Sequence, residues 1–298
     1  MGVVILLFSI ALLLGTETKV RPAFYQGIYL NPYAAGNRSY MNRILPRLTE
    51  GINVVVIDMK LDSGTIPYPS KVPMAEKVGA VRPVIRYVDE LMSKLKERGL
   101  YTIARVIVFK DEVLARYREG RYAIRNERGG IWVDRNGGVW VDPFCDEVWE
   151  YNLDIAAELA RIGFDEIQFD YLRFPSEGDV ANCVYRCQNE GEEKESAITA
   201  FLEGARRTLA PLGVRIGVDV FGFTVWQESL PLEGQDIELI GRYADVVYPM
   251  IYPSHFGAFK GDLNPGEREY LLIFESTRRA KERLSGTGAE LVVYLQGF

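Results

Sequence analysis

Residues 165–175, DEIQFDYLRFP, carry the clearest indication of how this chain folds. Apolar Ile167 and Phe169 alternate with Gln168 and Asp170, the two-residue period of a β-strand whose faces meet different surroundings. The apolar face is expected to pack outward on helices, and the polar face to point the other way. Asp170 then lies at the carboxyl end of a strand, where parallel α/β barrels carry their chemistry. We therefore interpret Asp170 as the centre of a candidate active site.

Alternating strands and helices extend from this stretch in both directions. Apolar runs predict strands, and helical periodicity predicts helices, in the following ranges: strands at 26–31, 52–60, 101–109, 214–222, 244–253 and 290–298, and helices at 39–50, 82–98, 149–162, 196–212, 235–243 and 267–284. The stretch 110–143 is predicted to be irregular. Nearly continuous apolar strands joined by helices favour a parallel sheet covered by helices.

A closed (β/α)₈ TIM-type barrel is the α/β fold that this pattern favours. Such a barrel typically has about 250 residues, and this chain has 298. No eighth strand and helix are visible, so the chain is interpreted as a barrel domain at 21–298 that lacks its last β/α unit. The alternative, an open doubly wound sheet, is disfavoured because no glycine-rich phosphate loop follows a predicted strand.

The first 20 residues form a separate apolar segment. Its run from Gly2 to Gly15 is shorter than the roughly 20 residues that a membrane-spanning helix needs. It resembles the apolar region of a signal peptide, although it lacks a charged start and an A-x-A cleavage site. Residues 1–20 are therefore predicted to be a signal peptide or an uncleaved N-terminal anchor, and the protein is expected to be secreted or attached to the cell envelope.

Charge and histidine content exclude several classes of function. The net charge of −6 argues against a nucleic-acid partner, which usually leaves a basic footprint. His255 is the one histidine of the sequence, so multi-histidine zinc sites are excluded and no metal or cofactor is expected. The 41 Asp and Glu residues are therefore the main candidates for acid–base catalysis. A chain with many carboxylates and one histidine suits reactions that use two carboxylates, such as glycoside hydrolysis.

Three cysteines, Cys145, Cys183 and Cys187, are too few for a disulfide scaffold. Cys183 and Cys187 lie four residues apart in a polar loop, and in an exported protein they could form a bridge. Free thiols without a functional role are an equally good interpretation.

In a barrel, the residues at the carboxyl ends of the strands face one mouth. The polar and aromatic residues at these ends are Asn31, Asp58, Lys60, Asp170, Asp219, Tyr248, Tyr252 and Gln296. By strand alternation Asp58 and Lys60 are expected to share a face. Asp58 has two equally good interpretations, a catalytic one and a salt bridge to Lys60 or to mid-strand Arg105.

The other two aspartates are stronger candidates for catalysis. Asp170 is followed by Arg173 and a long polar loop, which would surround it with further polar groups. As a candidate for catalysis, Asp219 ranks between Asp58 and Asp170. Its neighbours Gly217 and Gly222 leave the space that a ligand needs.

Aromatic side chains near the strand ends are candidates for stacking on the apolar faces of sugar rings. They include Trp140, Tyr248 and Tyr252, although packing of loops onto the barrel is the more frequent role of any single aromatic residue. Tyr171 is expected to point outward by alternation. Polar residues complete the predicted substrate-binding set: Lys60, Arg105, Arg173, His255 and Gln296.

Seven motifs spread over about residues 24 to 298 are similar to those of one protein family: VVIDMKLDSGTIPYPS, IARVIVFKDEVLA, WVDPFCDEVWEYNLDIA, GFDEIQFDYLRFPSEG, VDVFG, YPMIYPSHF and YLQGF. On these motifs the chain resembles a bacterial family classed with the glycoside hydrolases, domain-of-unknown-function family 4015. The resemblance implies a TIM barrel related to known glycosidases, and a polysaccharide or oligosaccharide as the partner. Family members usually continue past the YLQGF-like segment into an eighth unit.

The fourth strand resembles the DGxDxDxE motif of family 18 chitinases, but Leu172 stands where the catalytic glutamate would be. In the α-amylase-like clan, an aspartate ending the fourth strand is the nucleophile and an acid follows on the fifth. That likeness implies a nucleophile at Asp170 and an acid/base at Asp219, with Asp58 as the alternative acid. The rival interpretations are a carbohydrate-binding barrel of the cell envelope without turnover, and a structural envelope module.

Two geometric expectations follow for the candidate pair. The carboxyls of Asp170 and Asp219 should converge across one cleft, and a bidentate arginine pair that closes Asp170 to solvent would exclude it as the nucleophile. One carboxyl near Asp170, with Asp219 before Asp58, should have a raised pKa because of burial and a like-charged neighbour.

Overall fold

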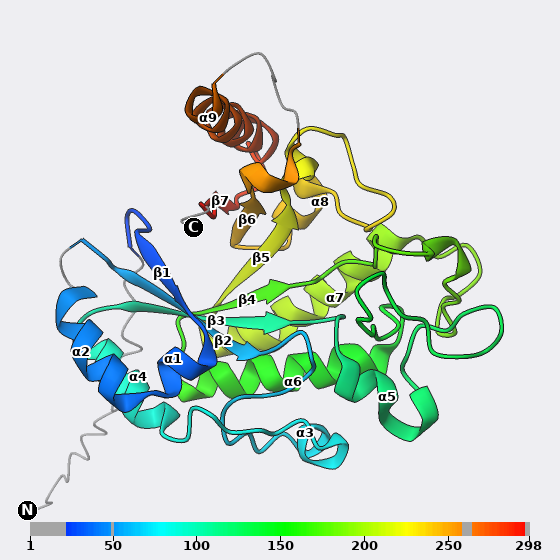
Figure 1. Ribbon diagram of the computed structural model, residues 1–298, viewed down its shortest axis with the longest axis horizontal. Helices are drawn as coiled ribbons and strands as arrows, with labels where there is room; N and C mark the ends of the chain where they lie inside the picture. The colour runs from blue at the N-terminus through cyan, green and yellow to red at the C-terminus, as the bar shows by residue number, and fades with distance from the viewer. Residues whose placement is uncertain (1–21, 49–50, 258–263, 296–298) are drawn as a thin grey trace, which may run out of the picture.

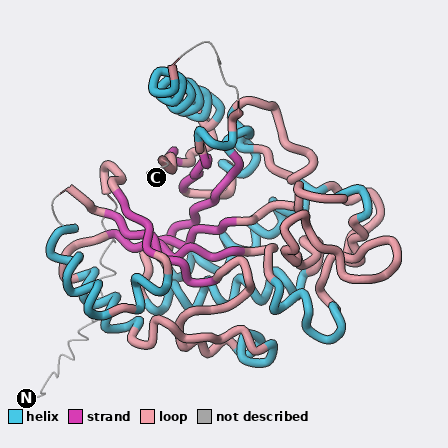
Figure 2. Tube along the Cα trace, viewed as in Figure 1, coloured by secondary structure: helices cyan, strands magenta, loops and turns pink. Residues whose placement is uncertain are grey.

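The computed structural model describes residues 22–48, 51–257 and 264–295, which form a parallel sheet with helices on its outer side (Figure 1). The strands are β1 (Gly27–Leu30), β2 (Val54–Lys60), β3 (Tyr101–Ile107), β4 (Glu166–Asp170), β5 (Arg215–Phe221), β6 (Val246–Met250) and β7 (Glu290–Leu291). Their order in the sheet is their order in the chain, and every neighbouring pair is parallel. Each connection therefore leads to the next strand on the same side of the preceding one, and the sheet is curled (Figure 2).

The predicted barrel is present only as a curled half-barrel of seven strands. Among the described residues β1 and β7 each have one neighbour, β2 and β6 respectively, and they are not paired with each other. β7 is also shorter than the predicted strand at 290–298. A lone bridge between Met250 and Tyr294 extends its contact with β6. The parallel α/β class was predicted correctly, and closure is not seen in the described ranges.

Helices connect the strands along the outer side of the sheet. They are α1 (Pro32–Gly36), α2 (Arg38–Leu48), α3 (Pro73–Val78), α4 (Val88–Lys96), α5 (Glu112–Gly120), α6 (Asp146–Ile162), α7 (Lys194–Leu209), α8 (Ile237–Gly241) and α9 (Pro265–Arg283). Short 3₁₀ turns lie at Val180–Asn182, Ala210–Leu212, Gly222–Val225 and Pro253–His255.

The structure differs from the predicted helix at 82–98 and from the predicted irregular stretch at 110–143. The helix predicted from residue 82 begins at Val88, because the Val84 and Ile85 N–H groups bond to the Pro67 carbonyl instead of continuing a helix. The stretch 110–143, predicted to be irregular, contains α5. Asp111 caps this helix by accepting the Leu114 N–H at 2.8 Å.

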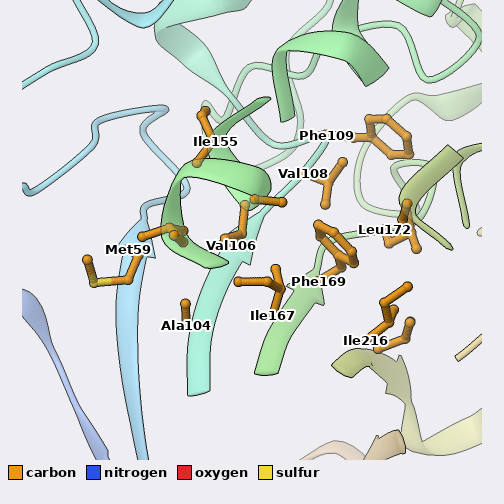
Figure 3. Packing of buried hydrophobic residues seen from close by; sticks show 14 of the residues in the cluster. Met59, Ala104, Val106, Val108, Phe109, Ile155, Ile167, Phe169, Leu172 and Ile216 are labelled. Carbon is orange, nitrogen blue, oxygen red and sulfur yellow. The ribbon is translucent and has the colours of Figure 1, made fainter. Parts of the chain in front are cut away.

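The main hydrophobic core lies between the sheet and the helices. Buried apolar side chains from β3, β4 and α6 meet there (Figure 3): Ala104, Val106, Ile167, Phe169 and Ile155. Gly163, at φ 112°, ends α6 and turns the chain toward β4. Since Ile167 and Phe169 occupy this outer layer, Gln168 and Asp170 must face the concave side of the curled sheet, as the alternation in 165–175 predicts.

A disulfide joins Cys145, at the start of α6, to Cys187, with Cα atoms 5.1 Å apart. The bridge between Cys183 and Cys187 that the spacing suggested is therefore wrong, and Cys183 is a free, half-buried thiol. The folding of the loop after β4 back onto the start of α6 decides the pairing, and sequence spacing does not show that contact.

The described part of the chain contains no helix that is both long and apolar enough to cross a membrane. The predicted signal peptide or anchor at residues 1–20 lies outside the described residues.

Candidate active site

A cavity of about 540 Å³ lies at the carboxyl ends of the strands, as expected for the mouth of a barrel. Acidic, basic and aromatic side chains form its walls: Tyr29, Arg105, Asp170, Tyr171, Arg173, Glu177, Asp219, Phe221, Met250, Tyr252, His255, Tyr294 and Leu295. Asp170 and Asp219 thus line one cleft, which agrees with the expectation from their strand-end positions.

Asp170 ends β4 and is held by Arg105 from the neighbouring strand β3. Arg105 Nε donates to Asp170 Oδ2 at 3.0 Å, and a second guanidinium nitrogen donates to the same oxygen. Oδ1 accepts the Tyr171 backbone N–H at 2.6 Å. The residue is only 3% exposed, but it lines the cavity, and both guanidinium contacts are made to Oδ2, so Arg105 does not bind the two oxygens as a bidentate pair that closes the carboxyl to solvent.

Tyr171 does not point outward as alternation predicts. Its φ of 50° is left-handed, a conformation that is unusual for a residue with a large side chain. The strand ends at Asp170, so the outward direction no longer applies to the next residue, and Tyr171 lines the cavity. Backbone strain beside a buried carboxylate is typical of functional sites.

Asp219, on β5, lies in the same wall but in a different environment. It is 2% exposed, its Oδ2 is 3.7 Å from Arg105 Nε, and its Oδ1 has no hydrogen-bond partner among the described groups. Burial raises the pKa of the Asp219 carboxyl well above its usual range, and the charge of Asp170 raises it further. Asp219 is therefore the carboxyl near Asp170 that has the expected raised pKa.

Asp58, on β2, is the third carboxylate that contacts Arg105. Its Oδ1 accepts from the guanidinium at 2.7 Å, and its Oδ2 accepts from the Tyr29 hydroxyl. Both oxygens therefore have a partner, and Asp58 is not among the residues that line the cavity. The salt bridge with Arg105 that the sequence suggested is present.

Lys60 does not share a face with Asp58. The register of β2 against β3 shifts between these two residues, from Asp58 opposite Arg105 to Lys60 opposite Val106. This bulge turns Lys60 into the outer layer, where its ammonium is fully buried 2.7 Å from Asp111 Oδ2. Lys60 is therefore a structural residue in this fold and lies outside the cavity.

Three other predicted substrate-binding residues line the cavity. The Arg173 guanidinium lies 4.3 Å from the ring centre of Phe221 and pairs with Glu177 at 3.2 Å. Tyr252 and His255 contact each other with ring centres 5.3 Å apart. Burial, followed by the nearby Asp219 and Asp170 charges, raises the pKa of Tyr252 to about 12.

Two predicted stacking residues lie elsewhere. Trp140 is fully buried under the loops and donates to Asp134 Oδ2 at 3.1 Å. Tyr248 is buried on the inner face of β6 and donates to Glu166 Oε1 at 2.5 Å. Gln296 lies outside the described residues.

The inner face of β4 carries one more acidic residue that the sequence analysis did not select. Glu166 is fully buried and also accepts from Tyr101 at 3.1 Å. Burial raises its pKa to about 7, against the opposing hydrogen bond from Tyr248. Gly217 is required beside it, since a Cβ there would lie 2.5 Å from Glu166 Oε1. The alternation Glu166, Gln168, Asp170 was the signal that could have identified it.

Several cavity residues were also missed, namely Tyr29, Glu177, Phe221 and Tyr294. Tyr29 could have been found because it precedes the end of β1 by one residue. Tyr294 reaches the cleft from the segment after β7 and donates to Gln168 Oε1 at 2.9 Å, a contact that no local pattern indicates.

One group within the described ranges has the spacing of metal ligands, Asp142 with Cys145 and Cys187. The two sulfur atoms are joined as a disulfide, which leaves no thiolate to bind a metal there.

Comparison with known proteins places these features in a family and a fold. The model of the family described as "Putative glycosyl hydrolase domain" matches residues 27–298. No curated protein sequence matches the chain. Among solved structures, a hypothetical protein from Ruminiclostridium thermocellum is 32% identical over 65% of this chain and 97% of its own, with a TM-score of 0.59.

Two more distant structures share the fold. The PgaB (BpsB) glycoside hydrolase domain from Bordetella bronchiseptica is 13% identical, with a TM-score of 0.60 over 91% of this chain and 94% of its own. The noncanonic maltogenic α-amylase AmyB from Thermotoga neapolitana is 14% identical, with a TM-score of 0.55 over 90% of this chain and 58% of its own.

Proposed function

The chain belongs to the family described as "Putative glycosyl hydrolase domain", and on this premise we propose that it hydrolyses glycosidic bonds of a polysaccharide with Asp170 and Asp219. The observation that supports this pair is their unequal environment in one cavity. Asp170 has the Arg105 counter-charge in contact, whereas burial keeps the pKa of Asp219 high. Two carboxyls whose environments differ in this way divide the roles of anion and acid between them.

In the proposed reaction Asp219 protonates the glycosidic oxygen while Asp170 attacks the anomeric carbon. The bond to the leaving sugar breaks, and an ester forms between Asp170 and the remaining glycosyl group. Asp219, now ionised, takes a proton from water, and the resulting hydroxide equivalent displaces Asp170. The second sugar is released and both carboxyls return to their starting protonation.

The spacing of the pair is compatible with retention of anomeric configuration. Arg105 Nε is 3.0 Å from Asp170 Oδ2 and 3.7 Å from Asp219 Oδ2. The two oxygens cannot be farther apart than the sum of these distances. This upper limit on the two Oδ2 atoms admits the carboxyl separation of about 5–5.5 Å found in retaining enzymes, and the reaction is therefore written with a covalent intermediate.

The remaining cavity residues have binding and positioning roles in this proposal. Arg173, Tyr252 and His255 offer hydrogen-bond donors to sugar hydroxyls, and Tyr171 offers an aromatic face. Asp58 is proposed as a positioning residue, since it orients Arg105 from outside the cavity.

We also propose that the protein is exported and acts in the cell envelope or outside the cell. The apolar N-terminal run supports this, as does the disulfide between Cys145 and Cys187, because disulfides persist mainly in oxidising compartments.

The proposed function is tested by replacing Asp170 with Asn, which is nearly isosteric. New reducing ends released from a panel of envelope and storage polysaccharides should fall by at least about 10³-fold, because the nucleophile is removed. Asp154→Asn, an exposed carboxylate of α6, is the matched control and should retain full activity. A polysaccharide that the Asp170→Asn variant hydrolyses at the wild-type rate would refute the assignment.

The same experiment separates hydrolysis from binding without turnover. A carbohydrate-binding barrel would release no reducing ends in either form, and Asp170→Asn would change only its affinity for the polysaccharide. A structural module would bind no polysaccharide in either form, and Asp170→Asn would change only the stability of the fold, since Arg105 loses one of its charged partners.

A further inference from the structure

A second pocket, of about 320 Å³, is lined by four arginines and one glutamate: Arg118, Arg121, Arg125, Arg186 and Glu119. The segment 116–128 holds five arginines and two glutamates, in a chain whose net charge is −6. The local charge is therefore opposite in sign to that of the whole molecule. The reaction proposed above uses none of these arginines.

Aromatic rings hold two of the guanidinium groups in place. The rings of Tyr117 and Tyr122 are stacked, with centres 6.5 Å apart and planes 6° apart. The Arg118 guanidinium lies 5.3 Å from the Tyr117 ring centre, and that of Arg121, which also pairs with Glu147 at 3.2 Å, lies 5.4 Å from the Tyr122 ring centre. An arginine supported on a ring loses less side-chain freedom when it binds a ligand.

Backbone carbonyls hold the third guanidinium. Arg125 donates to the carbonyls of Glu119 at 2.5 Å, Gly120 at 2.6 Å and Gly129 at 3.2 Å. Its Nε is a buried donor without a hydrogen-bond partner in the described part of the chain. Gly120 makes this arrangement feasible, because a Cβ there would lie 2.7 Å from an Arg125 nitrogen.

The fourth arginine is brought in by the loop after β4. Arg125 and Val184 exchange backbone hydrogen bonds of 3.1 and 2.7 Å. Cys187, adjacent to Arg186, is tied to Cys145 by the disulfide. Two chain segments that are about sixty residues apart are thus fixed beside each other, and each contributes arginine to the pocket.

We propose that this arginine pocket binds an oxyanion, a phosphate or carboxylate group carried by an anionic polysaccharide. Planar guanidinium groups donate paired hydrogen bonds that match the geometry of such oxyanions. A nucleic acid is disfavoured because the chain is acidic overall and because Tyr117 and Tyr122 stack on each other instead of standing free for bases. The choice of a polysaccharide as carrier rests on the proposed function, whereas oxyanion binding does not.

The binding of the oxyanion is tested with inorganic phosphate as the probe. The dissociation constant from calorimetric titration at low salt should rise about tenfold or more in Arg118→Gln/Arg186→Gln, because two charge-assisted contacts are lost. Arg207→Gln/Arg242→Gln removes the same charge from exposed positions and should bind phosphate like the wild type. Equal affinity in the pocket variant, with an unchanged melting temperature, would overturn the proposal.

The nature of the carrier is tested with three immobilised polymers. A phosphodiester-containing polysaccharide should retain the wild-type protein and not the pocket variant, and a neutral glucan should not distinguish them. Single-stranded DNA retained as strongly as the polysaccharide, through the same arginines, would overturn the choice of carrier. The Asp170→Asn variant should keep phosphate binding, and the pocket variant should keep hydrolysis of a neutral glycan. A failure of either proposal is thereby recognised separately.

Discussion

Arg105 is the residue on which the geometry of the candidate site depends. From β3, its guanidinium contacts the carboxyls of Asp58 on β2, Asp170 on β4 and Asp219 on β5. One cation cannot neutralise three buried anions, so the cluster is more stable when one carboxyl keeps its proton. Asp219 has the longest contact to Arg105 and an oxygen without a partner among the described groups, which is why the proton is placed there.

The raised pKa of Asp219 predicts a basic limit to activity. Hydrolysis requires protonated Asp219, so kcat/KM should fall as pH rises through the pKa of this carboxyl. Asp219→Asn should remove this basic limb and lower the rate on unactivated polysaccharides by about 10²–10⁴-fold. Nitrophenyl glycosides, whose leaving group needs little protonation, should lose much less. A basic limb that persists in the variant would assign the acid to another group.

Glu166 predicts a pH dependence of stability. Its pKa is raised from 4.5 to about 7, so the folded state binds the proton more tightly than the unfolded chain does. The stability that this proton contributes is complete below pH 4.5 and is lost as pH rises through about 7. The loss should be about 3 kcal/mol. Urea unfolding should show it in the wild type and not in Glu166→Gln, while exposed Glu150→Gln should behave like the wild type.

At the scale of elements, the bulge in β2 separates a residue of the site from a residue of the framework. Asp58 stays on the inner face, whereas Lys60 crosses to the outer layer and pairs with Asp111, the residue that caps α5. Both members of this pair are fully buried, and Lys60 also donates to the Ile107 carbonyl at 2.7 Å. The pair therefore joins the end of β2 to the start of α5.

Removing one member of this ion pair should be costly. Lys60→Met leaves the Asp111 carboxylate buried and unpaired, and it should lower the free energy of unfolding by about 3–5 kcal/mol. Lys60→Met/Asp111→Asn should recover much of this loss, because Asn is neutral and still caps α5. Chemical denaturation of the two variants provides the comparison. If the double variant is less stable than Lys60→Met, the pair is not the source of the effect.

At the scale of the whole molecule, one disulfide secures the loops beside the mouth of the half-barrel. The bridge between Cys145 and Cys187 spans 42 residues and includes β4, with Asp170 at its end. Its loss should lower the free energy of unfolding by about 4 kcal/mol if loop-closure entropy dominates. Denaturation of Cys145→Ser/Cys187→Ser measures this, and Cys183→Ser, which alters the free thiol, is the control. Equal stability of all three proteins would contradict the prediction.

Local sequence patterns were sufficient to predict the parallel α/β class, the positions of most elements and the inward direction of Asp170 and Asp219. These features follow from local periodicity, since alternating polarity along a strand already states which face is buried. The contacts between segments far apart in the chain could not be predicted from such patterns and were seen first in the folded chain. The bulge at Lys60, the disulfide partner of Cys145 and the position of Tyr294 against Gln168 depend on register and loop packing. The arrangement of three carboxylates around Arg105 also belongs here, because the curl of the sheet brings neighbouring strands together after local structure is formed.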